Sequence, residues 1–170
     1  KGLGLEDCIK VAEMIDDKVD LINVSCGNHE DPDMFCRTHP SAFYKRGVNV
    51  YLAAEIKKHV KTPVACVGSL NDPAQMEEII ASGQADVVEL GRASLADPYL
   101  PNKAYNDEAD DITPCLRCYE CFGATSELEM VKCAVNPLMG EQLRAKFPQK
   151  APERTVSYTH LRAHETRRHL

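Results

Sequence analysis

The chain has 170 residues, enough for one domain or part of one. Its 20 Lys and Arg against 26 Asp and Glu give a net charge of −6, and 44% of its residues are hydrophobic, which is typical of a globular protein. The acidic balance argues against a nucleic acid partner, because a phosphate-binding surface needs clustered basic residues. No apolar run reaches the roughly 18 residues of a membrane helix and no secretion signal is present, so we expect a cytoplasmic protein without a membrane partner.

Helices and strands are predicted to alternate along residues 5–90. Helical spacing of apolar residues predicts a helix from Leu5 to about Asp17, and a β-prone run predicts a buried strand from Asp20 to Ser25. A polar loop from Gly27 to about Gly47 follows, and loops of this length usually shape a site. The pattern continues with a helix over 50–60, a strand over 62–67, a helix that starts after Asn71 or Asp72 and ends at Gly83, and a strand over 86–90.

Short connections of this kind require parallel strands with helical crossovers, in either an open sheet or a closed (β/α)₈ barrel. Two successive strands end in Gly68-Ser69 and Gly91-Arg92, and many such barrels bind phosphate in the loops after strands 7 and 8. A GxGxxG fingerprint of the open alternative is absent. A whole barrel needs about 250 residues. We therefore predict an α/β fold in which residues 1–112 form the C-terminal part of a TIM barrel.

Four of the eight cysteines are clustered, and a tight cluster points to a metal rather than to disulfides. Three thiolates within seven residues and a fourth beyond a loop are typical of a [4Fe–4S] cluster. Structural zinc, which usually takes two separated CxxC pairs, is the alternative. We predict a cluster-binding segment over residues 113–140, with Cys115, Cys118, Cys121 and Cys133 as ligands.

A series of short motifs extends over much of the chain. They are Asp20-Leu-Ile-Asn-Val-Ser25, His29-Glu30, Thr62-Pro-Val-Ala-Cys-Val-Gly68, Asn71-Asp-Pro73, Ala81-Ser-Gly-Gln-Ala-Asp86, Gly91-Arg92, Leu95-Ala-Asp-Pro98 and Cys133-Ala-Val-Asn-Pro137. With these motifs, residues 5–137 resemble the NADH:flavin oxidoreductases related to old yellow enzyme. The resemblance is to the iron–sulfur branch, which includes 2,4-dienoyl-CoA reductase, 2-enoate reductase and trimethylamine dehydrogenase.

The resemblance implies cofactors and site residues. It implies that Gly68, Ser69, Gly91 and Arg92 hold the phosphate of FMN, and that the catalytic residue His29 lies over the flavin and binds or protonates the substrate. Electrons would pass from NAD(P)H through FAD and the cluster to FMN. His39 and His59 match no such motif.

The family's chemistry implies reduction of the activated C=C bond of a small enoate or enoyl substrate. The first three cysteines have CxxCxxC spacing, whereas dienoyl-CoA reductases usually have CxxCxxxC, which weakens the expectation of a CoA thioester. The alternatives are an amine dehydrogenase similar to trimethylamine dehydrogenase and a non-catalytic Cys₄ zinc module. A homo-oligomer is compatible with either enzyme.

The ends of the sequence carry expectations of a different kind. Residues 141–155 are predicted to be a linker to an FAD and NAD(P)H domain that is missing, as are barrel strands 1 to 5. Residues 156–170 resemble a translated sequencing adapter, which predicts a non-native tail. The chain alone is therefore expected to be inactive.

Overall fold

The computed structural model describes residues 2–127 and 130–141. Its parallel sheet has the order β1 (Ile22–Val24), β2 (Val64–Cys66) and β3 (Val87–Val88). Val24 pairs with Cys66, and Cys66 pairs with Val88. The predicted parallel arrangement is confirmed. Each strand is shorter than predicted, although Asp86 N and Glu89 N, which flank β3, still donate to the carbonyls of Val64 and Cys66 on β2.

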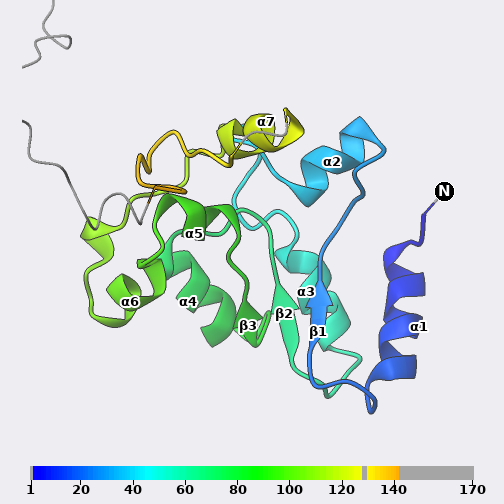
Figure 1. Ribbon diagram of the computed structural model, residues 1–170. Helices are drawn as coiled ribbons and strands as arrows, with labels where there is room; N and C mark the ends of the chain where they lie inside the picture. The colour runs from blue at the N-terminus through cyan, green and yellow to red at the C-terminus, as the bar shows by residue number, and fades with distance from the viewer. Residues whose placement is uncertain (1, 128–129, 142–170) are drawn as a thin grey trace, which may run out of the picture. The chain divides into compact units, whose positions relative to one another are not determined.

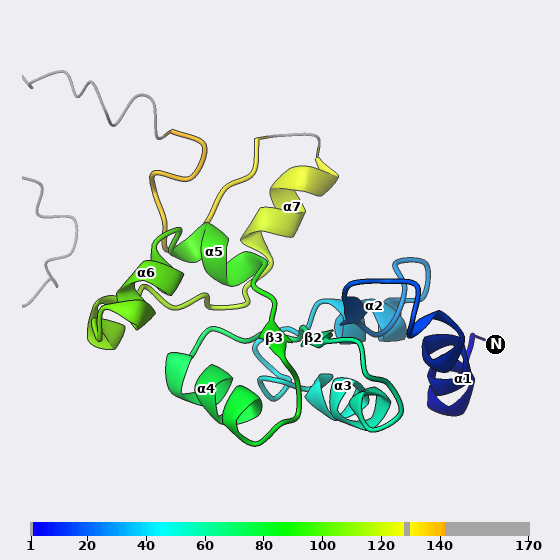
Figure 2. The same ribbon diagram turned by 90° about the horizontal axis from the view of Figure 1, so that it is seen from below.

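Three helices cover the strands: α1 (Leu5–Ile15), α3 (Val50–Lys57) and α4 (Pro73–Ala81). Figure 2 shows α3 and α4 on the same side of the strands. Ala53 and Val64 are fully buried in this layer, and burial of a side chain as large as valine contributes about 1.5–3 kcal/mol. The apolar residues that recur at helical spacing in the sequence are therefore the ones that pack against the sheet.

Side chains alternate across the strands, and this alternation gives the sheet two different faces. On β1, Ile22 and Val24 are buried in the core, whereas the intervening Asn23 is exposed. Ser25, two positions after Asn23, shares its face. The face away from the helices is therefore partly polar.

The predicted loop over 27–47 contains a helix, α2 (Pro32–Thr38), so its description as continuous loop is wrong. Asp31 caps this helix by accepting hydrogen bonds from the backbone N–H groups of Asp33 and Met34, and Pro32 occupies its first turn. The same Asp-Pro signal starts α4, where Asp72, and not Asn71, is the cap. The sequence therefore contained the signal for α2.

The remaining helices follow the strand ends: α5 (Arg92–Ala96), α6 (Leu100–Tyr105), the 3₁₀ helix η1 (Ala109–Asp111) and α7 (Glu120–Ser126). In Figure 1, α2, α5 and α7 lie beyond the carboxyl ends of the strands. The buried carboxylate of Asp97 holds this region together. It accepts hydrogen bonds from Tyr99 N at 3.0 Å, Lys103 Nζ at 2.7 Å and Thr113 N at 3.0 Å.

None of the helices in the described residues is long and apolar enough to cross a membrane. Of the predicted linker over 141–155, only Glu141 belongs to the described residues, and the predicted tail over 156–170 lies outside them.

We predict that Asp97→Asn lowers the free energy of unfolding by about 2–4 kcal/mol, because the amide has no charge to pair with Lys103 and its single oxygen can accept either from Tyr99 or from Lys103 and Thr113, but not from both sides. Burial alone would raise the pKa of Asp97, but the hydrogen bonds from Lys103, Thr113 and Tyr99 outweigh it and hold the pKa below its usual value. This stabilisation is present above about pH 4 and is lost as the pH falls through the lowered pKa.

Urea unfolding at a series of pH values checks this, and the gap between wild type and variant should narrow below about pH 4. The matched control is Asp110→Asn at an exposed position of η1, which should stay within about 0.5 kcal/mol of wild type. Equal stability of Asp97→Asn and wild type at neutral pH would mean that the Asp97 carboxylate does not stabilise the fold.

Candidate functional site

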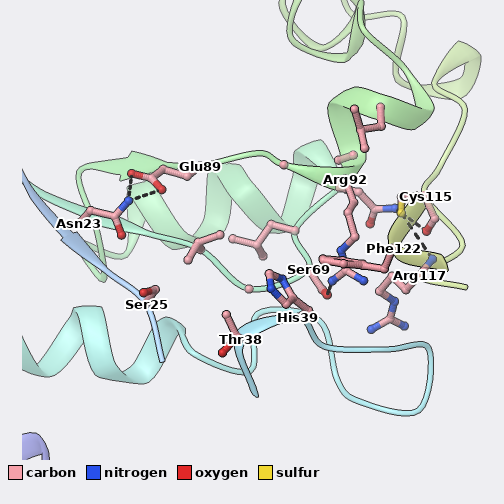
Figure 3. Close-up of a pocket in the computed structure, with 17 residues that line it drawn as sticks. Asn23, Ser25, Thr38, His39, Ser69, Glu89, Arg92, Cys115, Arg117 and Phe122 are labelled. Atoms are coloured by element: carbon pink, nitrogen blue, oxygen red, sulfur yellow. Dashed lines mark hydrogen bonds between the residues drawn. The ribbon is translucent and has the colours of Figure 1, made fainter. Parts of the chain in front are cut away.

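A cavity of about 540 Å³ lies at the carboxyl ends of the three strands (Figure 3). This volume is in the usual range for small-molecule sites. Its wall includes residues from the strand ends, from the region of α2 and from the cysteine-rich segment. The predicted phosphate-binding residues all belong to the wall: Gly68, Ser69, Gly91 and Arg92.

The glycines of this group keep the cavity open for different reasons. Gly68 has a φ of +149°, and a Cβ there would lie 3.3 Å from the backbone N of Asn49, so a side chain would be both strained and crowded. A Cβ on Gly91 would meet no protein atom within 4 Å. Protein packing therefore does not require glycine at position 91, and its small size leaves room for a ligand.

Arg92 is the main positive group of the wall. Its Nη2 donates to the carbonyl of Pro40 at 2.8 Å and to Ser69 Oγ at 3.0 Å. Its Nη1 is buried and has no hydrogen-bond partner among the described residues. A buried donor without a partner is costly, so an anion that accepts from Nη1 would be stabilised here.

Polar side chains from β1 and the end of β3 form another part of the wall. Asn23 Nδ2 donates to Glu89 Oε1 at 2.6 Å, and Figure 3 shows this pair well apart from Arg92. The sequence analysis missed both residues. The available signal was a polar residue inside each otherwise apolar strand, which indicates a face that does not belong to the core.

Two histidines meet beside the cavity. His29 Nε2 lies 3.0 Å from His39 Nε2, and His39 lines the cavity while His29 is exposed. Burial, followed by the positive charges of His29 and Arg92, lowers the pKa of His39 below its usual value. The sequence analysis singled out His29 and passed over His39, whose role as a wall residue no local motif signalled.

The predicted metal ligands Cys115, Cys118, Cys121 and Cys133 all line a second, smaller cavity of about 20 Å³. Cys118 is exposed and the other three are half-buried. Burial raises the pKa of Cys121, and the positive charge of Arg92 opposes this shift. Across residues 2–127 and 130–141, no three His, Cys, Asp or Glu side chains are grouped so as to hold a single metal ion.

Hydrogen bonds join the cysteine-rich segment to the chain around α2. Arg117 Nη1 donates to the carbonyl of Tyr44 at 2.6 Å, and the Tyr119 hydroxyl donates to the carbonyl of His39. Arg117 and Tyr119 both have left-handed backbones, with φ of 58° and 66°. Such conformations are uncommon outside glycine, and here they turn the chain between the cysteines.

Residues 5–111 match the model of the NADH:flavin oxidoreductase / NADH oxidase family, and the chain belongs to this family. The predicted resemblance is thus confirmed. Members of this family are flavin-dependent NAD(P)H oxidoreductases, and the parallel α/β structure described above is part of the family's TIM barrel.

The chain is 33% identical to cinnamate reductase of Clostridium sporogenes over 144 residues, which cover 84% of this chain and 21% of that protein. It is also 33% identical to dimethylamine dehydrogenase of Hyphomicrobium sp. (strain x) over 160 residues, 88% of this chain and 20% of that protein. The chain thus spans about a fifth of the length of these relatives.

The solved structure of 2-naphthoyl-CoA reductase with 2-naphthoyl-CoA matches with a TM-score of 0.75 at 29% identity. The match covers 89% of this chain and 23% of that one. The similar proteins therefore include a cinnamate reductase, a 2-naphthoyl-CoA reductase and a dimethylamine dehydrogenase.

We predict that Tyr119→Phe loosens the cysteine-rich segment, because the carbonyl of His39 loses its donor at a cost of about 1 kcal/mol. Native-state hydrogen exchange should show amide protection in α7 reduced roughly fivefold. The control is Tyr105→Phe, whose ring is 91% exposed and which should leave α7 unchanged. Unaltered exchange in Tyr119→Phe would mean that this hydrogen bond does not hold α7.

Proposed function

We propose that this chain forms the FMN-binding and iron–sulfur-binding part of an NAD(P)H-dependent ene reductase. The observation that carries the proposal is the buried, unpartnered Nη1 of Arg92, in the wall of the cavity that Gly68, Ser69 and Gly91 also line. A guanidinium together with adjacent backbone N–H groups forms a common kind of binding site for a phosphate.

The residues fit FMN in both charge and space. Arg92 and the backbone N–H of Ser69 would hold the phosphate, because the Ser69 hydroxyl already donates to the carbonyl of Pro40. Gly91 provides room for the phosphate because no protein atom lies near its missing side chain. The helix α5 has only five residues, so we attribute the anion affinity to the charge of Arg92 rather than to a helix dipole. Bound FMN would supply a hydride to the substrate.

The cysteine side chains fit an iron–sulfur cluster by their chemistry and placement. Four thiols line one small cavity, and Arg92 and Arg117 in the same wall would offset the negative charge of thiolate ligands. Structural zinc usually takes two separated CxxC pairs, whereas three of these cysteines fall within seven residues, so we favour the iron–sulfur cluster.

The wall of the cavity favours an anionic enoate over an amine as substrate. With Arg92 bound to the phosphate, Arg117 is the other arginine of this wall, and its positive charge repels an ammonium substrate. An amine would also need an aromatic cage, yet among the described residues Phe122 is the only Phe, Tyr or Trp of this wall. The aromatic residues Phe43 and Tyr51 are 98% and 59% exposed instead.

Amine oxidation is the second candidate, and the similarity to dimethylamine dehydrogenase supports it. Glu89 is the feature of the wall that could attract a cation. Anaerobic assays of the intact protein that carries this chain, with trans-cinnamate and with dimethylamine, separate the two: the proposal requires turnover of the alkene, and turnover of dimethylamine alone would contradict it.

We predict that Arg92→Met weakens FMN binding about 100-fold, because a charge-assisted hydrogen bond contributes up to roughly 3 kcal/mol. Fluorescence titration of the flavin-depleted intact protein with FMN measures this. Gly91→Ala should also weaken binding, since its new methyl group meets the ligand and not the protein.

The matched control for Arg92→Met is Arg37→Met on α2, where the guanidinium faces the ring of Tyr44 and does not line the cavity. Wild-type affinity is expected for this control. If Arg92→Met and Gly91→Ala also bind FMN as wild type does, the phosphate site lies elsewhere.

We predict that Cys133→Ala abolishes the iron–sulfur cluster. The intact wild-type protein, purified without oxygen, should contain about four irons with four sulfides at this site, and the variant should contain almost none. Cys8→Ala on α1, where the thiol packs against the core away from the cavities, should retain the iron. If the wild-type protein instead contains one zinc per chain, the four cysteines form a structural zinc site and the prediction of a cluster is wrong.

A further inference from the structure

We propose that the positive charge of Arg117 raises the reduction potential of the iron–sulfur cluster. This inference rests on the proposed function, because it concerns the cluster that Cys115, Cys118, Cys121 and Cys133 would bind. It assigns Arg117 a part in electron transfer, because the potential of the cluster decides how readily the site accepts an electron.

Arg117 lies inside the cysteine motif and lines the same small cavity as the four thiols. Its backbone N–H donates to Cys115 Sγ at 3.4 Å, and Figure 3 shows this hydrogen bond as a dashed line. Net charge and hydrogen bonds to the ligand sulfurs are among the features that set the potential of an iron–sulfur cluster. Arg117 therefore supplies both kinds of feature at one place.

Two backbone carbonyls hold the guanidinium of Arg117 in place. Its Nη1 donates to the carbonyl of Tyr44 at 2.6 Å, and its Nη2 donates to the carbonyl of Ala42 at 3.4 Å. Both acceptors are neutral, so they orient the side chain without cancelling its charge. In the part of the chain that the structure describes, no carboxylate forms an ion pair with Arg117. Its charge is therefore available to an anion in the cavity.

Neighbouring arginines make an anion more favourable here. Burial lowers the pKa of Arg117 below its usual value, and the positive charges of Arg46 and Arg92 lower it further. A Cys115 thiolate acts in the opposite direction, because it attracts the guanidinium. Arg92 would be paired with the phosphate of FMN, and Arg46 is exposed to solvent, which screens its charge. Half-buried Arg117 is thus the arginine whose charge acts most on the thiolates.

The sign of the effect follows from the charge that reduction adds. Reduction of the cluster takes up one electron and neither forms nor breaks a bond, so the cavity becomes more negative by one charge. In the intact protein this electron would come from a reduced nicotinamide through FAD and leave to FMN. A nearby positive charge stabilises the more negative state and so raises the potential. Glu120, a carboxylate in the same wall, opposes this only weakly because it is exposed.

The test is a redox titration of the intact protein that carries this chain, with dithionite as reductant, ferricyanide as oxidant and electron paramagnetic resonance of the reduced cluster as readout. Arg117→Asn removes the charge, and asparagine tolerates the left-handed backbone of this position, where φ is 58°. Its cluster should be about tenfold harder to reduce, which lowers the midpoint potential by about 59 mV. Arg117→Lys keeps the charge and should keep the wild-type potential.

Two further variants check the sign and the range of the effect. Glu120→Gln removes a negative charge from the same wall and should make the cluster easier to reduce. A shift in the same direction as that of Arg117→Asn would contradict the electrostatic cause. The matched control is Lys10→Met, which removes an exposed positive charge from α1, far from α7 in Figure 1, and should leave the potential unchanged.

The outcomes separate this inference from the proposed function. A wild-type potential in Arg117→Asn, with the cluster present, would overturn the inference and leave the proposed function standing. An equal fall in Arg117→Lys would also overturn it, because lost hydrogen bonds would then be the cause. If only the Asn variant fails to assemble a cluster, the charge at position 117 is required and the inference is supported, whereas failure of both variants would overturn it. Zinc in place of iron in the wild type would contradict the proposed function and this inference together.

Discussion

The buried guanidinium of Arg92 is the constraint on which the arrangement of the site depends. A buried charge is costly unless several partners surround it. The partners of Arg92 come from distant parts of the sequence: the carbonyl of Pro40, the hydroxyl of Ser69 and the ring of Tyr119, 5.5 Å from the guanidinium carbon. The segments after β1, β2 and β3 and the cysteine-rich segment are therefore held around one group.

A consequence is that the two cavities have a common wall. Arg92, Cys115 and Arg117 line both of them. A cofactor in the larger cavity and a cluster held by the cysteines would thus be separated by single side chains. Arg92 would face a phosphate on one side and thiolates on the other, so its positive charge would compensate two anionic groups.

Local patterns in the sequence predicted most of the fold and part of the site. Apolar spacing and the Asp72-Pro73 cap marked the helices, and the strand-end glycines marked the loops that Arg92 joins. The pairing of Asn23 with Glu89 could not be predicted in this way, because the two residues are 66 positions apart and meet only across the finished sheet. The place of His39 in the cavity wall could not be predicted from the sequence either, because it depends on how the fold orients the chain after α2.

The wall of the larger cavity lies on two kinds of structure. The phosphate end uses loops at strand ends, where Gly68 is crowded by Asn49 and tolerates little change. Residues 27–34 are exposed, whereas residues 35–39 are half-buried and Pro40 is buried, and exposed segments vary more freely than the scaffold that supports them. Relatives with equal identity to this chain are a cinnamate reductase and a dimethylamine dehydrogenase, so one scaffold carries both kinds of protein. Exposed residues around the cavity are where such proteins can differ without loss of the fold.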